Sequence, residues 1–132
     1  MQKIMDSIPH RDPFLFVREI VDRTNDSITT KTIFESQYEF FKGHFPDNPI
    51  VPGVLLCEAV FQSGAILMDG KEKTPIVTRI QNTKFKNFLK PDEQVQIHVQ
   101  IIESLENAFH LKGKILKDST TILTINFSCA LI

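Results

Sequence analysis

An isolated carboxylate and a nearby histidine are the residues of this chain best suited to acid–base chemistry. Residues 43–62 read GHFPDNPIVPGVLLCEAVFQ, and Glu58 is the one charged residue between positions 48 and 68. No basic residue lies three or four positions from Glu58, so a helix there offers it no local salt bridge. Burial raises the pKa of a carboxyl group, and a group that keeps its proton can act as a general acid.

A base and a donor that can polarise a carbonyl group lie close to this acid in the sequence. His44 stands between Gly43 and Phe45, and a neutral imidazole there can act as a general base. Gly53 follows Pro52 at the predicted start of a helix, where a backbone N–H lacks an intrahelical partner. Together these groups suit removal of a proton next to a carbonyl group with loss of a β-hydroxyl group. That reaction requires neither a metal nor a redox cofactor.

Each of the two side chains also has a purely structural interpretation. Glu58 can reach solvent at the edge of the helix, or it can take part in a buried ion pair. His44 can be a loop histidine whose ring is bound by backbone carbonyl groups. Such structural roles are the commoner ones for these residue types. The apolar surroundings weaken them here, because they restrict solvent and leave the carboxyl group without a local partner.

The elements that must position these residues can be predicted from the hydrophobic pattern. Residues 38–52 contain Pro46, Pro49 and Pro52, which predict a stiff loop that forms neither helix nor ladder. Residues 53–70 are apolar on nearly every side and predict a helix that the rest of the protein wraps. A short helical turn is expected at 2–8, and strands are expected at 14–24, 27–35, 75–85, 93–102, 108–117 and 120–132. One antiparallel sheet curled round one helix is the simplest packing, so the predicted fold class is α+β.

Composition limits the class of protein. The chain has 132 residues, 42% of them hydrophobic, and a net charge of −1, which favours one folded domain over residues 1–132. This charge balance gives no general attraction to nucleic acid or to a membrane surface. The N-terminus has no apolar signal segment, and Glu58 would be costly in a membrane-spanning helix, so a cytoplasmic protein is expected. Cys57 and Cys129 lie in apolar segments and are expected to be buried and reduced.

The segment GHFPDNPIVPGVLLCEAVFQ closely resembles the signature of the β-hydroxyacyl-acyl-carrier-protein dehydratases of the FabZ type. IPHRDPFLFV at residues 8–17 and KFKNFLKPDEQV at residues 84–95 extend the resemblance. It implies a hot-dog fold, a sheet wrapped round a long central helix, in agreement with the packing predicted above. It also implies a hydro-lyase without a cofactor. Such an enzyme removes water from a (3R)-hydroxyacyl thioester and leaves a trans-2-enoyl thioester, in fatty-acid or related acyl-chain synthesis.

The resemblance implies a role for each matching residue. His44 matches the base that removes the C2 proton, and Glu58 matches the acid that protonates the departing 3-hydroxyl group. Gly53 matches the backbone donor to the thioester carbonyl, and Gln62 matches a glutamine that orders the surroundings of the carboxylate. Glu rather than Asp at position 58 favours the FabZ type over the related FabA type. In the family the two catalytic residues come from opposite subunits, so a homodimer with composite sites is expected, often assembled as a trimer of dimers.

Some residues depart from the family pattern, and they bear on the range of substrates. Asp12 and Arg18 replace a tyrosine and an aspartate that are common in the family. Phe61 replaces a residue that is usually small. We expect Phe61 to line the acyl tunnel with Phe45 and Pro52, where its bulk would alter the preferred chain length.

Acyl carrier protein, which is acidic, is the partner that the resemblance implies. Four basic residues are predicted to form its landing site near the tunnel mouth: Arg79, Lys84, Lys86 and Lys90. Ordinary solvated strand residues are the alternative interpretation of these four. The other histidines lack the spacing of a metal site, so His98 and His110 are interpreted as surface residues. His10 is expected to stabilise the first turn.

Two other functions stay open at the level of the sequence. A hot-dog acyl thioesterase also places a carboxylate on the central helix, but it activates water and does not need the histidine of the GHF segment. A non-catalytic acyl-binding or scaffolding relative would keep the fold without turnover. Replacement of His44 separates the thioesterase from a dehydratase, and a turnover assay separates the non-catalytic relative from both.

Overall fold

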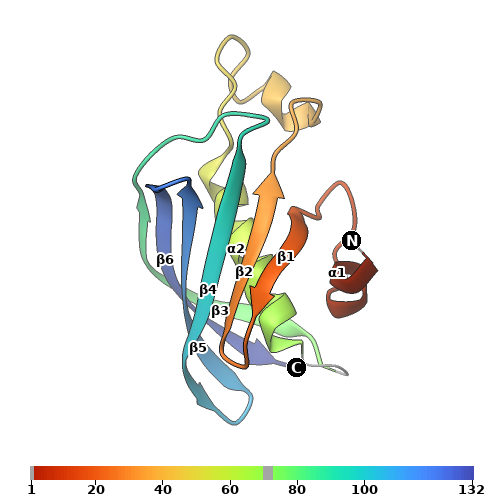
Figure 1. Cartoon of the computed structure of the whole chain (residues 1–132), viewed down its shortest axis with the longest axis vertical. Coiled ribbons are helices and arrows are strands. Elements are labelled where there is room, and N and C mark those ends of the chain that lie inside the picture. The colour runs from red at the N-terminus through yellow and green to blue at the C-terminus, as the bar shows by residue number, and fades with distance from the viewer. Residues whose placement is uncertain (1, 70–72) are drawn as a thin grey trace.

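The computed structural model describes residues 2–69 and 73–132 of the chain (Figure 1). The elements in chain order are α1 (Gln2–Ser7), β1 (Val17–Arg23), β2 (Ser27–Ile33), the 3₁₀ helix η1 (Glu39–Lys42), α2 (Gly53–Met68), β3 (Pro75–Phe85), β4 (Gln94–Leu105), β5 (Ala108–Lys117) and β6 (Thr120–Leu131). The predicted helix at 53–70 therefore ends at Met68, and Gly70 lies outside the described residues.

The strands form one curved sheet round the central helix. Within the described residues the sheet has six antiparallel strands in the order β1-β2-β4-β5-β6-β3, so β1 and β3 are its edges. Helix α2 packs mainly against β2 and β4, and Figure 1 shows it running behind these strands. This is the hot-dog arrangement, and the predicted α+β class is confirmed.

Strand β2 shows how alternation places side chains against the helix. Every second residue of β2 faces the helix and is buried: Ile28, Thr30 and Thr32. Phe34, which follows the strand in the same alternation, is buried as well. The hydroxyl of Thr30 lies 2.9 Å from the hydroxyl of Ser63 on α2, and Ser63 in turn donates to the carbonyl oxygen of Ala59. A buried hydroxyl is costly without a partner, so this pair fixes β2 on α2 at a defined position.

Helix α2 is enclosed on most sides, as its apolar sequence predicts. Residues 62–67 are all buried, which leaves no solvent-facing stripe over that stretch. Arg23, at the end of β1, donates from Nη2 to the carbonyl oxygen of Leu67 at 3.1 Å. This contact satisfies one carbonyl group of the last turn. No helix of the described residues is long and apolar enough to cross a lipid bilayer.

The loop prediction for residues 38–52 is wrong at its start and holds for the remainder. Residues 39–42 form η1, in which the Phe41 N–H donates to the carbonyl oxygen of Tyr38. The first proline of the segment is Pro46, so the N–H groups before it are free to make such bonds. The prolines stiffen only the later part of the segment.

Strand β1 begins at Val17 and not at residue 14 as predicted. The backbone groups before it bond to a side chain of α2 in place of a neighbouring strand. The Phe16 N–H donates to Oε1 of Gln62, and the carbonyl oxygen of Phe14 accepts from Nε2 of Gln62, both at 2.9 Å. This link holds the loop between α1 and β1 against α2, close to Glu58.

Candidate active site

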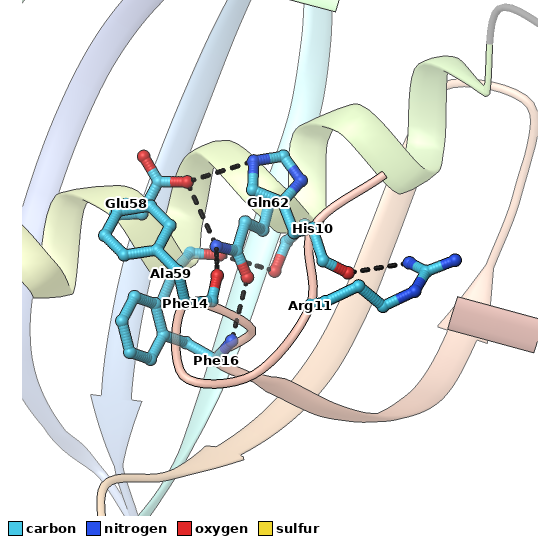
Figure 2. Close-up of polar contacts among 8 residues, drawn as sticks. His10, Arg11, Phe14, Phe16, Glu58, Ala59 and Gln62 are labelled. Carbon is cyan, nitrogen blue, oxygen red and sulfur yellow. Dashed lines mark hydrogen bonds and ion pairs between the residues drawn. The ribbon is translucent and has the colours of Figure 1, made fainter. Parts of the chain in front are cut away.

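Glu58 lies on α2 where the loop between α1 and β1 covers the helix (Figure 2). Its side chain is 21% exposed, and burial raises the pKa of its carboxyl group above the ordinary value. A hydrogen bond from Gln62 and the imidazole of His10 act in the opposite direction and lower this pKa. The net rise extends the pH range in which Glu58 carries a proton, which is the form that a general acid requires.

Gln62 is fully buried and uses both ends of its amide group (Figure 2). Its Nε2 donates to Oε2 of Glu58 at 3.0 Å and to the carbonyl oxygen of Phe14, while its Oε1 accepts from the Phe16 N–H. A carbonyl oxygen can only accept and an N–H can only donate, so these partners fix the orientation of the amide. Gln62 therefore holds one carboxyl oxygen of Glu58, and its part in the reaction stays a prediction.

A pocket of about 340 Å³ lies beside Glu58, between α2 and β3. Beyond Glu58 and His10 its walls are apolar or weakly polar: Phe61, Ala65, Met68, Pro75, Ile76, Val77, Ile80 and Cys129. Phe61 packs on Phe127 with ring centroids 5.0 Å apart, which steadies its ring in the wall. A mainly apolar pocket with a carboxyl group in its wall suits an acyl chain whose polar end lies at Glu58.

His44 follows η1, and its hydrogen bond defines which nitrogen is free. Nδ1 lies 2.9 Å from the carbonyl oxygen of Ile50, which can only accept, so Nδ1 carries a proton. In the neutral ring Nε2 is then the unprotonated nitrogen that a general base requires. The Ile50 N–H also donates to the backbone carbonyl oxygen of His44. The imidazole ring stacks on the ring of Phe45, with the two ring centroids 4.3 Å apart. The backbone carbonyl of Ile50 thus binds Nδ1 of His44, as expected for a histidine with a structural role in a loop, but it leaves Nε2 unexplained.

His44 lines a second pocket, of about 350 Å³, at the beginning of α2. The other lining residues are almost all apolar: Phe45, Ile50, Val51, Gly53, Leu56, Phe85, Asn87, Phe88 and Leu89. Phe85 is 54% exposed and Phe88 is 81% exposed, which is unusual for side chains of this size. Apolar rings therefore stand at the solvent side of this pocket.

In the described part of the chain, His44 and Glu58 line different pockets. Gly53 lies in the first turn of α2 and lines the His44 pocket. Glu58 comes five residues later, roughly 7.5 Å along the helix axis. A single chain thus brings together His44 and Gly53, the predicted base and backbone donor, but it places Glu58, the predicted acid, in a separate pocket.

Gly53 is in direct contact with the ring of Phe85. A Cβ atom at position 53 would lie 2.8 Å from Cε1 and 3.0 Å from Cζ of that ring. A glycine lets the beginning of α2 approach the end of β3 this closely. The preceding residue, Pro52, offers its carbonyl oxygen to the N–H groups of Leu55 and Leu56 and so starts the helix.

We expect Gly53→Ala to lower the free energy of unfolding by about 1 kcal/mol, because the added methyl group overpacks the contact with Phe85. The ring is half exposed and can swing aside, which keeps the cost small. Urea unfolding of Gly53→Ala, made in the wild type and in a Phe85→Ala background, measures this cost. In the Phe85→Ala background, Gly53→Ala should no longer lower the free energy of unfolding. An equal loss of this free energy in both backgrounds would show that contact with Phe85 is not the reason why position 53 requires glycine.

The four basic residues predicted to bind a carrier protein are all exposed. Lys84 and Lys86 stand on either side of Phe85, and Lys90 follows Leu89. Three of the four therefore border residues that line the His44 pocket. Arg79 also belongs to β3 but comes five residues before Lys84.

Other sequence predictions can be placed in the same way. Cys57 and Cys129 are free and buried, as predicted, and burial raises the pKa of Cys129 to about 11. His98 and His110 are half-buried rather than fully exposed, and they contact the hydroxyls of Thr29 and Ser128. The described residues contain no group of three His, Cys, Asp or Glu side chains arranged to hold a metal ion.

Comparison with known families identifies the chain. A family model described as ApeI-like, ApeI dehydratase, matches residues 20–121. The chain belongs to the ApeI-like dehydratase family. Among curated relatives of this ApeI-like protein, FabZ of Caldicellulosiruptor bescii is 40% identical over 125 residues, covering 89% of this chain and 82% of the relative. FabZ of Gluconobacter oxydans is 37% identical over 134 aligned positions, which cover 96% of this chain and 79% of the relative. The predicted resemblance to FabZ-type dehydratases is confirmed.

Solved structures agree with the fold of this ApeI-like chain. The dehydratase heterocomplex ApeI:P from Xenorhabdus doucetiae superposes with a TM-score of 0.84 at 11% identity, covering 98% of this chain and 90% of that chain. A hypothetical thioesterase with coenzyme A from Streptococcus pneumoniae superposes with a TM-score of 0.70 at 8% identity, covering 99% and 92%. At such identities these likenesses establish the hot-dog fold and not the activity.

Two residues at which this ApeI-like chain departs from the FabZ pattern lie together. Arg18 approaches Asp12 at 3.7 Å and also donates to the hydroxyl of Tyr38. These residues line a surface pocket that is separate from those of His44 and Glu58. The two departures therefore form a charge pair with each other, at a pocket that neither His44 nor Glu58 lines.

His10 is the residue of this site that the sequence did not assign. It is predicted to stabilise the first turn, but Nε2 of its ring lies 3.4 Å from Oε2 of Glu58. The one available signal is the segment IPHRDPFLFV, which resembles the family and contains both His10 and the residues bonded to Gln62. The pattern of that segment does not reveal which helix it covers.

Proposed function

We propose that this ApeI-like protein is a 3-hydroxyacyl-[acyl-carrier-protein] dehydratase, a hydro-lyase. FabZ relatives that are 36–40% identical over most of the chain support this function. The observation that carries the chemistry is the carboxyl group of Glu58, which is partly buried in the wall of a mainly apolar pocket and has a raised pKa. Such a group can supply a proton to an oxygen that leaves the substrate.

In the proposed reaction, Nε2 of His44 takes the proton from C2 of a 3-hydroxyacyl thioester. The electron pair of that C–H bond forms the C2–C3 double bond as the C3–O bond breaks. Glu58 gives its proton to the leaving hydroxyl group, so water and a trans-2-enoyl thioester are released. The N–H of Gly53, at the positive end of α2, would polarise the thioester carbonyl and stabilise charge that develops there.

We propose that the working site combines His44 of one protomer with the partner subunit's Glu58. The two residues line separate pockets within a chain, so a second chain is needed to supply the missing group. β3 is an edge strand with exposed apolar side chains at Ile76, Ile80 and Phe85. An unpaired edge of this kind favours association with another chain. We therefore propose a homodimer, with a trimer of dimers as the larger assembly.

The groove beside Glu58 suits the acyl chain of the substrate. Phe61 lines this groove and Phe45 lines the His44 pocket, which supports their proposed places in an acyl tunnel. The thioester end would then lie at the His44 pocket, beside the exposed Phe85 and Phe88. We place the enzyme in the cytoplasm, in line with its two free cysteines.

Hydration of trans-2-enoyl thioesters, the reverse reaction, tests the function directly. Purified protein should convert enoyl thioesters of different chain lengths into 3-hydroxyacyl thioesters, followed by loss of absorbance of the conjugated thioester. Cleavage of the thioester without hydration would instead support an acyl thioesterase. Neither reaction would indicate a non-catalytic acyl-binding protein.

Charge reversal at Lys84 and Lys86 tests the proposed carrier-protein site. We expect Lys84→Glu with Lys86→Glu to raise KM for a carrier-bound substrate by about tenfold, because each reversal replaces attraction of the acidic carrier by repulsion. KM for a pantetheine thioester should change less than twofold. High salt should narrow the difference between the two substrates, because exposed charges are screened.

The double reversal of Lys3→Glu and Lys31→Glu provides a control with the same change in net charge. These residues belong to α1 and β2, whereas Lys84 lies on β3 at the opposite edge of the sheet. The control should leave both KM values unchanged. An equal loss on carrier-bound and pantetheine substrates would contradict the assignment of Lys84 and Lys86.

A further inference from the structure

The proposed reaction leaves the contact between His10 and Glu58 unexplained (Figure 2). His10 belongs to the loop between α1 and β1, and a neighbouring guanidinium group fastens that loop. Arg11 donates to the carbonyl oxygens of Met5, Ile8 and His10 at 3.0, 2.9 and 2.7 Å. The backbone of the loop is therefore held without any contribution from the imidazole.

The imidazole itself has one polar neighbour among the described residues. Its Nε2 faces Oε2 of Glu58 at 3.4 Å, while its Nδ1 is buried without a hydrogen-bond partner in residues 2–69 and 73–132. A histidine whose task is to fasten a loop would use this nitrogen on a backbone group. In this structure the ring nitrogen that has a polar neighbour, Nε2, instead faces the carboxyl group of Glu58.

Two side-chain nitrogen atoms approach the same oxygen of Glu58. Nε2 of Gln62 donates to Oε2 at 3.0 Å, and Nε2 of His10 lies beside Oε2 as well. The amide of Gln62 cannot turn over, because its two ends are bound to Phe14 and Phe16. The Gln62 amide nitrogen can only donate, so Oε2 serves as an acceptor, and the proton of the acid is then better placed on the other oxygen, Oε1. An Nε2–H group of His10 would be a second donor to Oε2.

We propose that His10 is a positioning residue for Glu58: with Gln62 it keeps Oε2 as the acceptor oxygen, so that Oε1 carries the proton given to the substrate. This inference rests on the proposed function, because it gives His10 a part in that proton transfer. It also explains why the loop after α1 covers the helix at this point. A ring that only filled space there would not need a nitrogen facing the carboxyl group.

The charges around Glu58 make this proposal testable by titration. The groups that face the carboxyl group are His10 from the loop, Gln62 from α2 and, in the wall of the pocket, Cys129 from β6. The other lining side chains carry no charge. Burial raises the pKa of Glu58 and His10 lowers it, so loss of His10 should let this pKa rise further.

The experiment combines carbon-13 NMR titration of the Glu58 carboxyl group with hydration kinetics of a pantetheine enoyl thioester. Glu58→Gln identifies the signal. His10→Leu removes the nitrogen that faces Oε2, and it should raise the pKa of Glu58 and lower kcat about tenfold with KM changed less than twofold. His10→Gln keeps an N–H donor near the position of Nε2, so its kcat should recover to within about threefold of wild type.

His98→Gln, on the outer part of the sheet, is the matched control and should change neither quantity. An unchanged pKa of Glu58 in folded His10→Leu would overturn the proposal. Where His10→Leu fails to fold, a kcat of His10→Gln that is reduced tenfold or more would overturn it. Unchanged kcat in a folded His10→Leu would overturn it as well. Failure of the wild type to hydrate any enoyl thioester would instead overturn the proposed function, and the titration separates the two cases because it requires no turnover.

Discussion

Replacing His44 with alanine is expected to lower kcat for hydration of an enoyl thioester by about 10²–10⁴-fold. The ring is held with Nδ1 bonded to the carbonyl oxygen of Ile50, so Nε2 is the free base, and alanine provides no substitute for it. KM should change little, because the pocket around His44 is lined mainly by other, apolar side chains. Steady-state hydration of a pantetheine enoyl thioester measures both constants.

His98→Ala is the control for loss of an imidazole at a position outside the two pockets of the proposed site. It should retain the activity of the wild type. Thioester cleavage that survives in His44→Ala would favour an acyl thioesterase, since such an enzyme activates water without this histidine. Hydration that survives would remove His44 from the proposed mechanism.

His44→Ala also tests whether the site is composite. Co-expression with Glu58→Gln gives mixed dimers in which one site has lost both groups and the other keeps both. If random pairing makes half of the dimers mixed, about a quarter of the wild-type activity should return. Sites that lie within single chains would each lack one catalytic group, and no activity would return.

Most of the fold could be predicted from the sequence because each element carries its own pattern. The alternation in residues 75–85 and 108–117 predicts β3 and β5 with the bounds observed, and the apolar run from Gly53 predicts α2. The exceptions have contacts that no local pattern contains. β1 starts late because Phe16 bonds to a glutamine that is 46 residues away, and η1 forms because the prolines begin only at Pro46.

The site could be predicted in part, for a related reason. His44, Gly53 and Glu58 stand out because their types and spacing are unusual in an apolar segment. The contact of His10 with Glu58 depends on how a loop folds over the helix, which is decided by Arg11 and Gln62 together. Such a contact has no periodicity, so it becomes visible only with the tertiary structure.

Glu58→Gln is expected to lower kcat for hydration by about 10²–10⁴-fold, because the amide has the shape of the carboxyl group but no transferable acidic proton. Gln62 can still donate to the amide oxygen, so the packing of α2 should be kept. KM should stay within about threefold. Glu58→Asp shortens the side chain by one methylene and should retain part of the activity, since the acid is preserved but displaced from its groove.

Stability supplies a second, independent readout of the same substitution. Burial raises the pKa of Glu58 in the folded protein above the value of about 4.3 expected in the unfolded chain. The folded state therefore binds this proton more tightly, and the resulting stability is present below the unfolded pKa and is lost as the pH rises through the folded pKa. Glu58→Gln has no such proton to lose. Its Tm relative to wild type should accordingly rise as the pH increases from about 4.3 through the folded pKa of Glu58, and then level off. A difference in Tm that does not vary with pH would show that the pKa of Glu58 is not raised in the folded protein.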